Sequence, residues 1–481
     1  MKIFKHLHQA KRRAKVVQDS GESALGGSAK LPNSGFAFVD NSQGSSAAIA
    51  ELSGSLDVAL EQIDYERNPG DQLQLQLQRL YKEAAKYANS SLDGDTPAEE
   101  WNCSSVEAEV VSAAFSCAAA VYDPESEPSI AGFACRRDAY IAPTAGGTVK
   151  ATAVSLVERT SPASGGGGGG GGGRPASPLL PMLVVAVRGT ASRVDRMVML
   201  NGRSKDMGAL LVSGSDPARG NVDDLLSPRP ADVCAHAGFL NGAEALVPAV
   251  AKHIDALAEN KSAVKHVLFT GHSAGGAVAS LLFAKFLSLA PTQYPSLLFS
   301  SISFGAPPVT RPDLTHPILA AANRGLVLSI VNEYDLVPRA DNDYVRSLVD
   351  LYRSIYSLPP IQDRPEQDPT PRLPRLSFDT RNANPAPDPR PSWPLPSPEY
   401  FHIGQIVVFK VKLAEPAADG GAGGGAASDA DDLVLRAVTV APNHFARLLF
   451  GSVSVHGRVC YRERVKMLLE GRFNGRESWA P

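Results

Sequence analysis

The second half of the chain alternates between short apolar runs and longer segments with helical periodicity. Helical patterns extend from Cys234 to about Leu257 and from Gly276 to Leu289. Apolar runs of strand length lie before, between and after them, at 182–187, 267–270, 299–304, 326–331, 403–411 and 433–440. Apolar strands that alternate with helices are typical of a parallel sheet covered on both faces. We therefore predict the α/β class, with a mostly parallel central sheet flanked by helices.

The first half predicts helices before any sheet. Residues 46–66, 71–88 and 104–121 have helical patterns, and the residues from Tyr140 to Val157 change to the alternation of strands. We interpret residues 46–100 as a helical extension ahead of the main domain. The first 45 residues combine a basic start with many Gly, Ser and Asn residues and predict a disordered tail. Residues 1–20 could also form a helix on a membrane surface.

Three low-complexity segments interrupt the main domain. Nine consecutive glycines begin at Gly165, a segment rich in Pro, Arg and Asp follows later, and a third segment is rich in Ala, Gly and Asp. Compositions of this kind do not build a core, so each predicts an inserted loop. The predicted organisation is a tail at 1–45, a helical extension at 46–100, a main domain at 101–460 with insertions at 160–176, 358–398 and 414–432, and a C-terminal tail at 461–481.

A Gly-x-Ser-x-Gly sequence carries the clearest chemical signal. The β-prone residues 266–270 lead into Gly-His-Ser-Ala-Gly at 271–275, and a helix follows. In this context the sequence is typical of a nucleophile elbow, whose serine hydroxyl is exposed at the tip of the turn. Gly271 and Gly275 lack Cβ atoms and allow the strand and the helix to approach closely. We interpret Ser273 as a nucleophile; the alternative is an ordinary turn rich in small residues.

The strand at 182–187 ends in Arg-Gly-Thr, and Thr190 is well placed to offer a backbone N–H to an oxyanion. An ordinary loop start is the alternative. The residues at 193–233 combine Met- and Leu-containing pieces with a loop-like sequence. They predict a lid with one apolar face, with a buried helix as the alternative.

A carboxylate follows the strand at 326–331. In open α/β sheets functional residues gather beyond the carboxyl ends of strands, and Asp335 lies there. We expect Asp335 to orient a catalytic histidine, although it could instead cap a helix. Other carboxylates of the same loop remain as alternatives: Glu333, Asp341 and Asp343.

An activated serine needs a histidine as base, and in the order Ser, Asp, His it lies after Asp335. His444 leaves the strand at 433–440 for a loop before a helical run, where an imidazole can move. We predict His444 as the base. Two alternatives remain: His402, which enters a strand, and His456, which lies in a later Ser/Val/Gly loop. We do not expect His272 to serve as base to its neighbour.

Composition narrows the classes of partner. The hydrophobic fraction of 43% supports a large core, and the net charge of −3 gives no reason to expect nucleic acid. Five cysteines with no zinc-like spacing predict reduced thiols and no zinc site. We expect neither a metal nor an organic cofactor. No apolar stretch is long enough to span a membrane, and no h-region follows the basic start. We expect a cytoplasmic or otherwise intracellular protein, not one secreted by a signal peptide.

Several ordered blocks resemble the class 3 lipases, the fungal-type triacylglycerol lipase family of the α/β-hydrolase fold. The resemblance covers about residues 101–460. Its blocks are Val-Arg-Gly-Thr at 187–190, His-Ala-Gly-Phe at 236–239, the elbow at 271–276, Phe-Gly-Ala-Pro at 304–307, the acid loop at 331–339, the segment 400–404 and Pro-Asn-His at 442–444.

The resemblance implies a complete catalytic site. It makes Ser273 the nucleophile, Asp335 the orienting acid and His444 the base. It assigns the oxyanion hole to the N–H groups of Thr190 and Ala274 and gives 400–404 a supporting histidine. The sequence departs from the family at Asn443, where Asp is common, and in the aromatic residue displaced to Phe450.

The expected activity is that of a serine lipase. It would hydrolyse tri-, di- or monoacylglycerols through an acyl-enzyme at a lipid interface, with peripheral contact to a membrane or lipid droplet. A phospholipase or a general carboxylesterase is the alternative within the enzymes. A catalytically inactive lipase-like binding or signalling module is the alternative from another class.

Overall fold

The structure is a computed structural model. It describes residues 71–92, 98–144, 149–160, 179–189, 203–211, 233–259, 263–360, 390–413, 433–476 and 478–479. The chain divides into two units, Met1–Gly44 and Ser45–Pro481, and every described residue belongs to the second. The predicted tail at 1–45, the predicted helix at 46–66 and the glycine tract lie outside the described residues.

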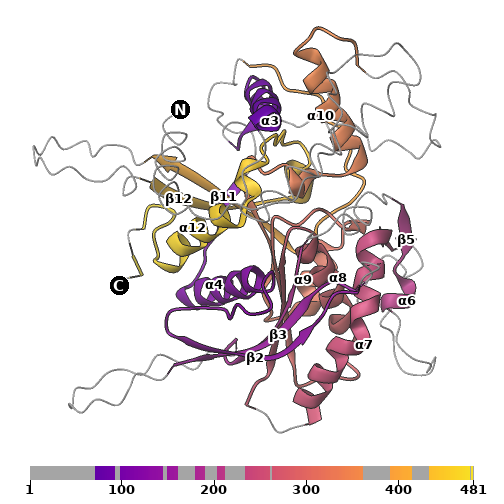
Figure 1. Ribbon diagram of the computed structural model, residues 1–481, viewed down its shortest axis with the longest axis vertical. Coiled ribbons are helices and arrows are strands. Elements are labelled where there is room, and N and C mark those ends of the chain that lie inside the picture. Colours follow the sequence, from indigo (N-terminus) through magenta and orange to yellow (C-terminus); the bar gives the residue numbers. More distant parts are fainter. Residues whose placement is uncertain are drawn as a thin grey trace, which may run out of the picture. The chain divides into compact units, whose positions relative to one another are not determined.

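A mixed sheet organises the second unit (Figure 1). In the part of the chain that the structure describes it has nine strands, in the order β1-β12-β11-β10-β8-β7-β4-β3-β2. The parallel strands at its centre are β4 (Met182–Val187), β7 (His266–His272), β8 (Leu298–Phe304), β10 (Val327–Asn332) and β11 (Gln405–Leu413). The outer strands pair antiparallel: β1 (Ala98–Glu100), β12 (Leu433–Val440), β2 (Phe133–Ile141) and β3 (Thr152–Arg159). The predicted fold class is confirmed.

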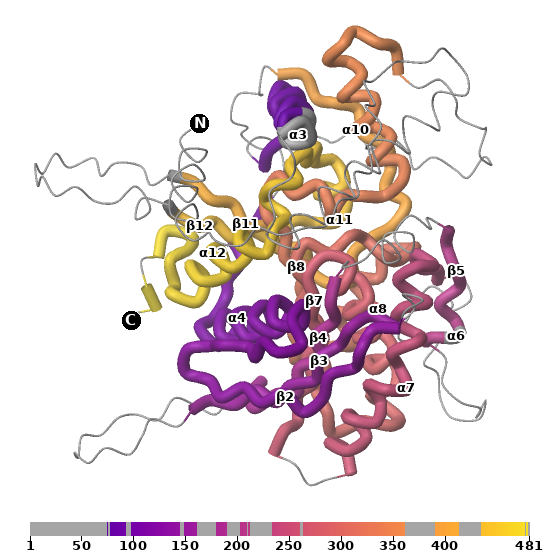
Figure 2. Tube along the Cα trace, viewed as in Figure 1, coloured from indigo at the N-terminus to yellow at the C-terminus, as the bar shows by residue number. Residues whose placement is uncertain are grey.

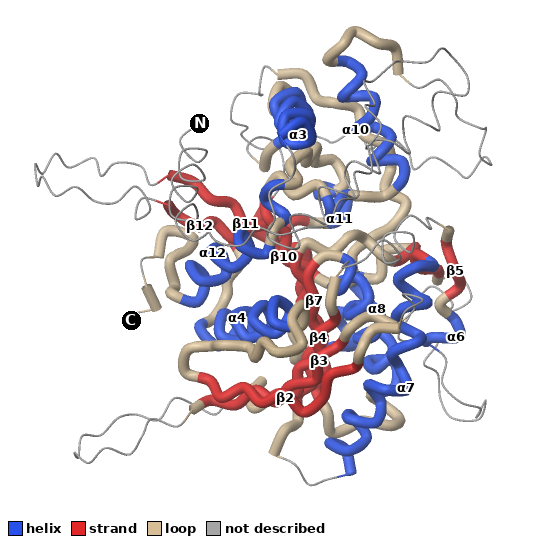
Figure 3. The backbone as a smooth tube through the Cα atoms, in the orientation of Figure 1, coloured by secondary structure: helices blue, strands red, loops and turns tan. Residues whose placement is uncertain are grey.

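Helices cover both faces of the sheet (Figure 3). One face packs against α7 (Ala237–Glu259), α8 (Ala274–Leu289) and α9 (Thr315–Ala322), and the other against α4 (Ser105–Ala120) and α12 (Arg458–Leu469). In β7, Val267 and Phe269 join the first of these cores and Leu268 joins the second. Both faces of the strand are therefore dry, which explains why its sequence is apolar throughout.

A capping box starts α4. The Ser104 hydroxyl accepts a hydrogen bond from the Glu107 backbone N–H, and the Glu107 carboxylate accepts one from the Ser104 backbone N–H. The helix then passes between the sheet and α12, so its apolar run is buried on more than one side.

The helical extension packs on one helix of the main domain. Its helix α3 (Asp71–Ala84) contacts α10 (Asn342–Ser354), and a 3₁₀ turn, η2 (Ala88–Ser90), follows (Figure 2). Leu80 and Ala84 share a core cluster with Leu348, against which Trp393 packs. Trp393 lies in the segment that we predicted as an inserted loop, and its described end, residues 390–398, is therefore packed against the main domain.

The described part of the predicted lid is also packed. Residues 203–211 form β5 (Ser204–Asp206) and α6 (Gly208–Leu211), and β5 joins a small sheet with β6 (Cys234–His236) and β9 (Thr310–Arg311). Met207 and Leu210 are buried against the α7–α8 core. This part matches the buried alternative, whereas residues 193–202 and 212–232 lie outside the described residues. None of the described helices is long and apolar enough to cross a membrane.

Candidate functional site

The predicted elbow is present between β7 and α8. Ser273 has φ 58° and ψ −135°, a backbone conformation that costs free energy in a residue with a Cβ atom. A Cβ atom added to Gly271 would lie 2.4 Å from the carbonyl carbon of Gly275, and one added to Gly275 would lie 2.2 Å from the Val187 carbonyl oxygen. The two glycines are thus required by the close approach of strand and helix.

The end of β4 borders the elbow. A Cβ atom added to Gly189 would lie 2.8 Å from the His272 carbonyl oxygen and 3.4 Å from Ser273 Cβ. Thr190 is the next residue and lies outside the described residues, so its predicted N–H contact stays a prediction. Ala274 is the first residue of α8, where a backbone N–H has no partner within its own helix.

Asp335 is buried in a polar network at the carboxyl end of β10. Its Oδ2 accepts hydrogen bonds from His456 Nδ1 at 2.9 Å and from the Tyr461 hydroxyl at 2.8 Å. Its Oδ1 accepts one from the Val337 backbone N–H at 3.0 Å. Since Nδ1 of His456 carries the proton in this contact, the neutral imidazole keeps the lone pair of a base on Nε2.

The histidine on Asp335 is His456, and this corrects the prediction of His444. Asp335 receives its side-chain contacts from His456, Tyr461 and Val337. His444 instead lies half-buried in α11 (Pro442–Phe445), a short helix after β12. His456, at the end of the 3₁₀ turn η6 (Ser454–His456), is fully buried.

Strand direction explains the difference. The prediction placed His444 in the loop that follows the strand at 433–440, in a sheet that was expected to be mostly parallel. β12 runs antiparallel to β11, so that its last residue, Val440, is level with Ile406 near the start of β11. Asn332 at the end of β10 is instead level with Phe409. The chain reaches Asp335 itself further on, where Ser452 bridges to it.

Two contacts bring His456 to the elbow. His272 Nε2 donates a hydrogen bond to the His456 carbonyl oxygen at 2.8 Å, and the two imidazole rings are 4.7 Å apart. The second contact is at Gly305, whose backbone lies close to both His456 and Asp335. A Cβ atom added to Gly305 would lie 3.0 Å from His456 Cε1 and 3.1 Å from Asp335 Oδ2. Its neighbour Phe304 accepts a hydrogen bond from the Ser273 backbone N–H at 2.9 Å.

His272 stays neutral at this position. Burial lowers its pKa well below the ordinary value, and the neighbouring His456 lowers the pKa further. Its Nδ1 faces the Tyr122 hydroxyl at 3.4 Å, at the end of α4. His272 is therefore a neutral donor to the His456 carbonyl oxygen.

Sequence reasoning missed Tyr461. It lies on α12, the Asn332 backbone N–H donates to its hydroxyl at 3.0 Å, and burial raises its pKa well above the ordinary value. It is thus a hydroxyl donor to Asp335 and not a phenolate. Its position five residues after His456 has no local signal in the sequence.

The other candidates have structural roles. Asp341 caps α10 through the Tyr344 backbone N–H at 2.8 Å. Glu333 forms a buried ion pair with Lys410. His402 bonds through Nε2 to the Pro338 carbonyl oxygen at 2.8 Å, and burial lowers its pKa to about 4. His402 thus supports the acid loop, the role that the resemblance implied for it.

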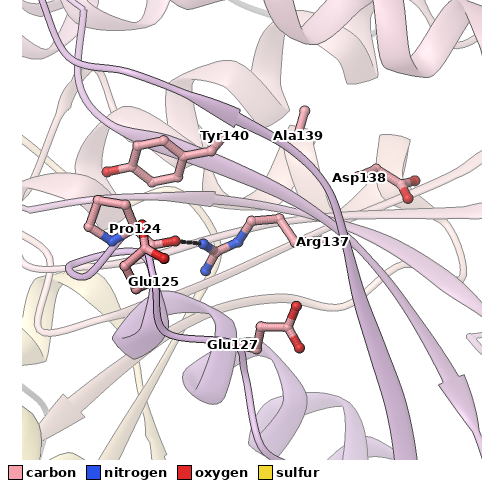
Figure 4. Close-up of a pocket in the computed structure, with 7 residues that line it drawn as sticks. All are labelled: Pro124, Glu125, Glu127, Arg137, Asp138, Ala139 and Tyr140. Carbon is pink, nitrogen blue, oxygen red and sulfur yellow. Dashed lines mark hydrogen bonds between the residues drawn. The ribbon is translucent and has the colours of Figure 1, made fainter.

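A separate hollow of about 390 Å³ lies over the edge strand β2 (Figure 4). Arg137 crosses it and donates to the carbonyl oxygens of Pro124 and Ser126. Its lining contains no histidine, serine or cysteine: Pro124, Glu125, Glu127, Arg137, Asp138, Ala139 and Tyr140. In the sheet order β3 and β4 separate β2 from the elbow strand, so this hollow is not part of the site.

Residues 184–344 match the model of the family described as Lipase (class 3). The match covers about a third of the chain. This match confirms the resemblance and supports a lipase-type hydrolase. The matched segment contains Ser273 and Asp335 and ends before each of the three candidate histidines. The histidine therefore has to be identified from the structure.

Solved lipases show a distant likeness. A triacylglycerol lipase described as having a serine protease triad is 18% identical over 51% of this chain and 77% of its own, with a TM-score of 0.30. The lipase from Rhizopus microsporus var. chinensis is 17% identical over 53% and 78%, with a TM-score of 0.31. Lip2 lipase from Yarrowia lipolytica is 14% identical over 51% and 77%, with a TM-score of 0.33. No curated protein matches the chain.

Proposed function

We propose that the protein is a serine-dependent lipase that hydrolyses carboxylic esters of acylglycerols at a lipid interface. The observation that carries the proposal is the placement of Ser273 on a strained elbow beside the Asp335–His456 pair. A nucleophile, a base and a carboxylate in this order have the roles of a catalytic triad. The family match supports the lipid ester as substrate.

The reaction would follow from these positions. His456 Nε2 takes the hydroxyl proton of Ser273 as Oγ attacks the ester carbonyl, and Asp335 stabilises the imidazolium that forms. The backbone N–H groups of Ala274 and Thr190 hold the oxyanion. His456 then protonates the departing alcohol, and water, deprotonated by the same imidazole, releases the fatty acid from Ser273. The protein groups are sufficient for each step.

Replacement of the nucleophile tests the proposal. Ser273→Ala should abolish labelling by a fluorophosphonate and lower ester hydrolysis by roughly 1,000-fold or more. Ser280→Ala is the matched control, because Ser280 is a buried serine of α8 whose hydroxyl donates to the Ala277 carbonyl oxygen of the same helix. Full activity of Ser273→Ala on a short-chain ester would refute the mechanism.

Substrate class needs a second experiment. The wild-type protein is assayed on triacylglycerol, phospholipid and a soluble ester, each across the concentration at which the lipid aggregates. A jump in turnover on acylglycerol at that concentration supports an interfacial lipase. A hyperbolic curve favours the general carboxylesterase, and preference for phospholipid favours the phospholipase. Absence of labelling and turnover in the wild type would favour the non-catalytic binding module. The intracellular location stays a prediction.

A further inference from the structure

A buried ion pair lies beside Asp335. Glu333 Oε1 is 3.3 Å from Lys410 Nζ, and the two side chains are 2% and 7% exposed. Glu333 precedes Asp335 by two residues in the loop after β10, and Lys410 belongs to the adjacent strand β11. Taking two charges out of water is costly, so the pair holds its geometry only because both groups are fixed by their surroundings.

The same carboxylate binds the N-terminal extension. Glu333 Oε1 accepts a hydrogen bond from the Leu92 backbone N–H at 3.1 Å. Asn89 fastens this part of the extension, because its side chain bonds both backbone groups of Trp393 and the Arg447 carbonyl oxygen, at 2.9–3.0 Å. Residues 89–92 therefore join the acid loop to two other segments. They lie outside the segment that matches the lipase family.

The residue between Glu333 and Asp335 is strained. Tyr334 has φ 74°, a conformation that a side chain with a Cβ atom rarely adopts. Its ring packs edge-on against Tyr81 of α3 and against Phe450, and its carbonyl oxygen accepts a hydrogen bond from the Ser452 backbone N–H at 2.9 Å. Strain of this kind persists only where the surroundings impose it.

We propose that Glu333 is a positioning residue: held by Lys410 and by the Leu92 N–H, it fixes the turn at Tyr334 that directs Asp335 toward His456. This inference rests on the proposed function, since it assigns Asp335 to the triad. It makes the extension at 71–92 part of the catalytic assembly and not an appendage. The histidine segment is tied to the same turn. Ser452 makes backbone hydrogen bonds to the residues on both sides of Asp335, and the chain leads from Ser452 directly into η6 and His456.

A variant without either charge tests the proposal. Glu333→Met with Lys410→Met removes the ion pair and the acceptor for Leu92 without leaving one charge buried alone. We expect kcat and the rate of fluorophosphonate labelling to fall at least about tenfold, because a small misplacement of a catalytic group is costly. KM for a soluble short-chain ester should stay within about twofold, since no substrate contact changes.

The pH profile separates positioning from mere stability. Asp335 favours the charged imidazole, so a displaced Asp335 lowers the pKa of His456. The acid limb of labelling rate against pH should then move to lower pH by about half a unit or more. A purely structural pair would lower the melting temperature and leave the rate and the pH limb of the folded protein unchanged, which would overturn the proposal.

A variant that keeps only the hydrogen-bond acceptor of Glu333 tests the contact with Leu92. Glu333→Gln with Lys410→Met keeps a carbonyl oxygen for the Leu92 N–H and should be intermediate, about threefold to fivefold below wild type. If the double Met variant does not fold, this variant decides alone, and a wild-type rate overturns the proposal. The control is Glu109→Gln, which breaks the Glu109–Arg159 pair at the opposite end of β3 from the site and should not change the labelling rate.

Amide hydrogen exchange keeps the two proposals separate. We expect faster exchange at residues 333–337 and 452–456 in the double Met variant than in the wild type. Unlabelled wild-type protein would refute the proposed function, and the exchange rates would still show whether Glu333 holds the acid loop. Unchanged exchange in the folded variant would refute the positioning role.

Discussion

Ser273 and the Asp335–His456 pair are held in different ways. Ser273 is positioned by regular secondary structure: β7 lies in the centre of the sheet, α8 is buried on nearly all sides, and two glycines join them. Asp335 and His456 are positioned by polar contacts between loops that are 121 residues apart in the chain. The first region depends on apolar packing and backbone fit, and the second on a network of hydrogen bonds and buried charges.

This difference has a consequence for what each region tolerates. Apolar packing is non-directional and spread over many residues, so the elbow is specified by a local pattern. The acid–histidine network depends on few directional contacts, each of which needs both partners. We therefore expect changes at the elbow to affect folding first, and changes in the network to affect the rate first.

The histidine assignment should give the largest effect. His456→Ala removes the imidazole on Asp335 and should lower ester hydrolysis by roughly 1,000-fold or more, because triad members act as a unit. His444→Ala changes a half-buried side chain of α11 and should leave the rate within about threefold. Fluorophosphonate labelling measures both variants. An inactive His444→Ala beside an active His456→Ala would restore the sequence prediction.

The elbow glycine should affect folding. Gly275→Ala places a Cβ atom against the backbone of β4 and should lower the free energy of unfolding by about 3 kcal/mol or more. Gly132→Ala meets nothing within 4 Å but has φ +80°, so it should cost only about 1 kcal/mol. Urea unfolding compares the two. If both variants lost the same free energy of unfolding, the close approach at the elbow would not be the reason why Gly275 is required.

The tyrosine on Asp335 should affect the rate more than the fold. Tyr461→Phe removes a hydrogen bond to a buried carboxylate and should lower kcat roughly tenfold. Tyr294→Phe is the matched control. Tyr294 is also buried, and its hydroxyl donates a hydrogen bond of 2.6 Å to Asp255, which is not part of the site. Stopped-flow hydrolysis of a soluble ester would measure kcat for each. Equal rates in both variants would remove Tyr461 from the network that positions Asp335.

The far end of the elbow strand should affect stability only on acidification and should leave the rate at neutral pH unchanged. Burial lowers the pKa of His266 to about 4, and its ring bonds the Leu179 carbonyl oxygen and the Ser300 hydroxyl. The unfolded chain takes up a proton near its ordinary pKa of about 6.5, so acidification from there to about pH 4 favours unfolding by up to about 1.4 kcal/mol per pH unit. Below about pH 4 both states are protonated and the contribution is constant.

Urea midpoints between pH 7 and pH 4 measure this dependence. His266→Gln should flatten the loss of stability on acidification relative to wild type. His402, whose pKa is also lowered to about 4 by burial, should leave a remaining slope in that variant. An unchanged slope would mean that the buried histidine of β7 does not link folding to pH.

The sequence predicted the site as far as local patterns reach. The elbow, the position of Asp335 after β10 and the alternation of strands and helices each follow from residues that are close in the chain. The lid prediction is different: its described part, residues 203–211, is packed into the core around Met207. Its apolar residues indicated burial, but the sequence could not specify the surface against which they are buried.

The chain by itself determined the elbow that carries Ser273, because this turn needs only a strand, a helix and two glycines that its own neighbours supply. The tertiary structure decided the histidine. β12 runs antiparallel to β11, and a later bridge at Ser452 brings the chain to Asp335 just before His456. Strand direction and loop pairing depend on contacts between distant segments, so no local pattern around His456 encodes its partnership with Asp335.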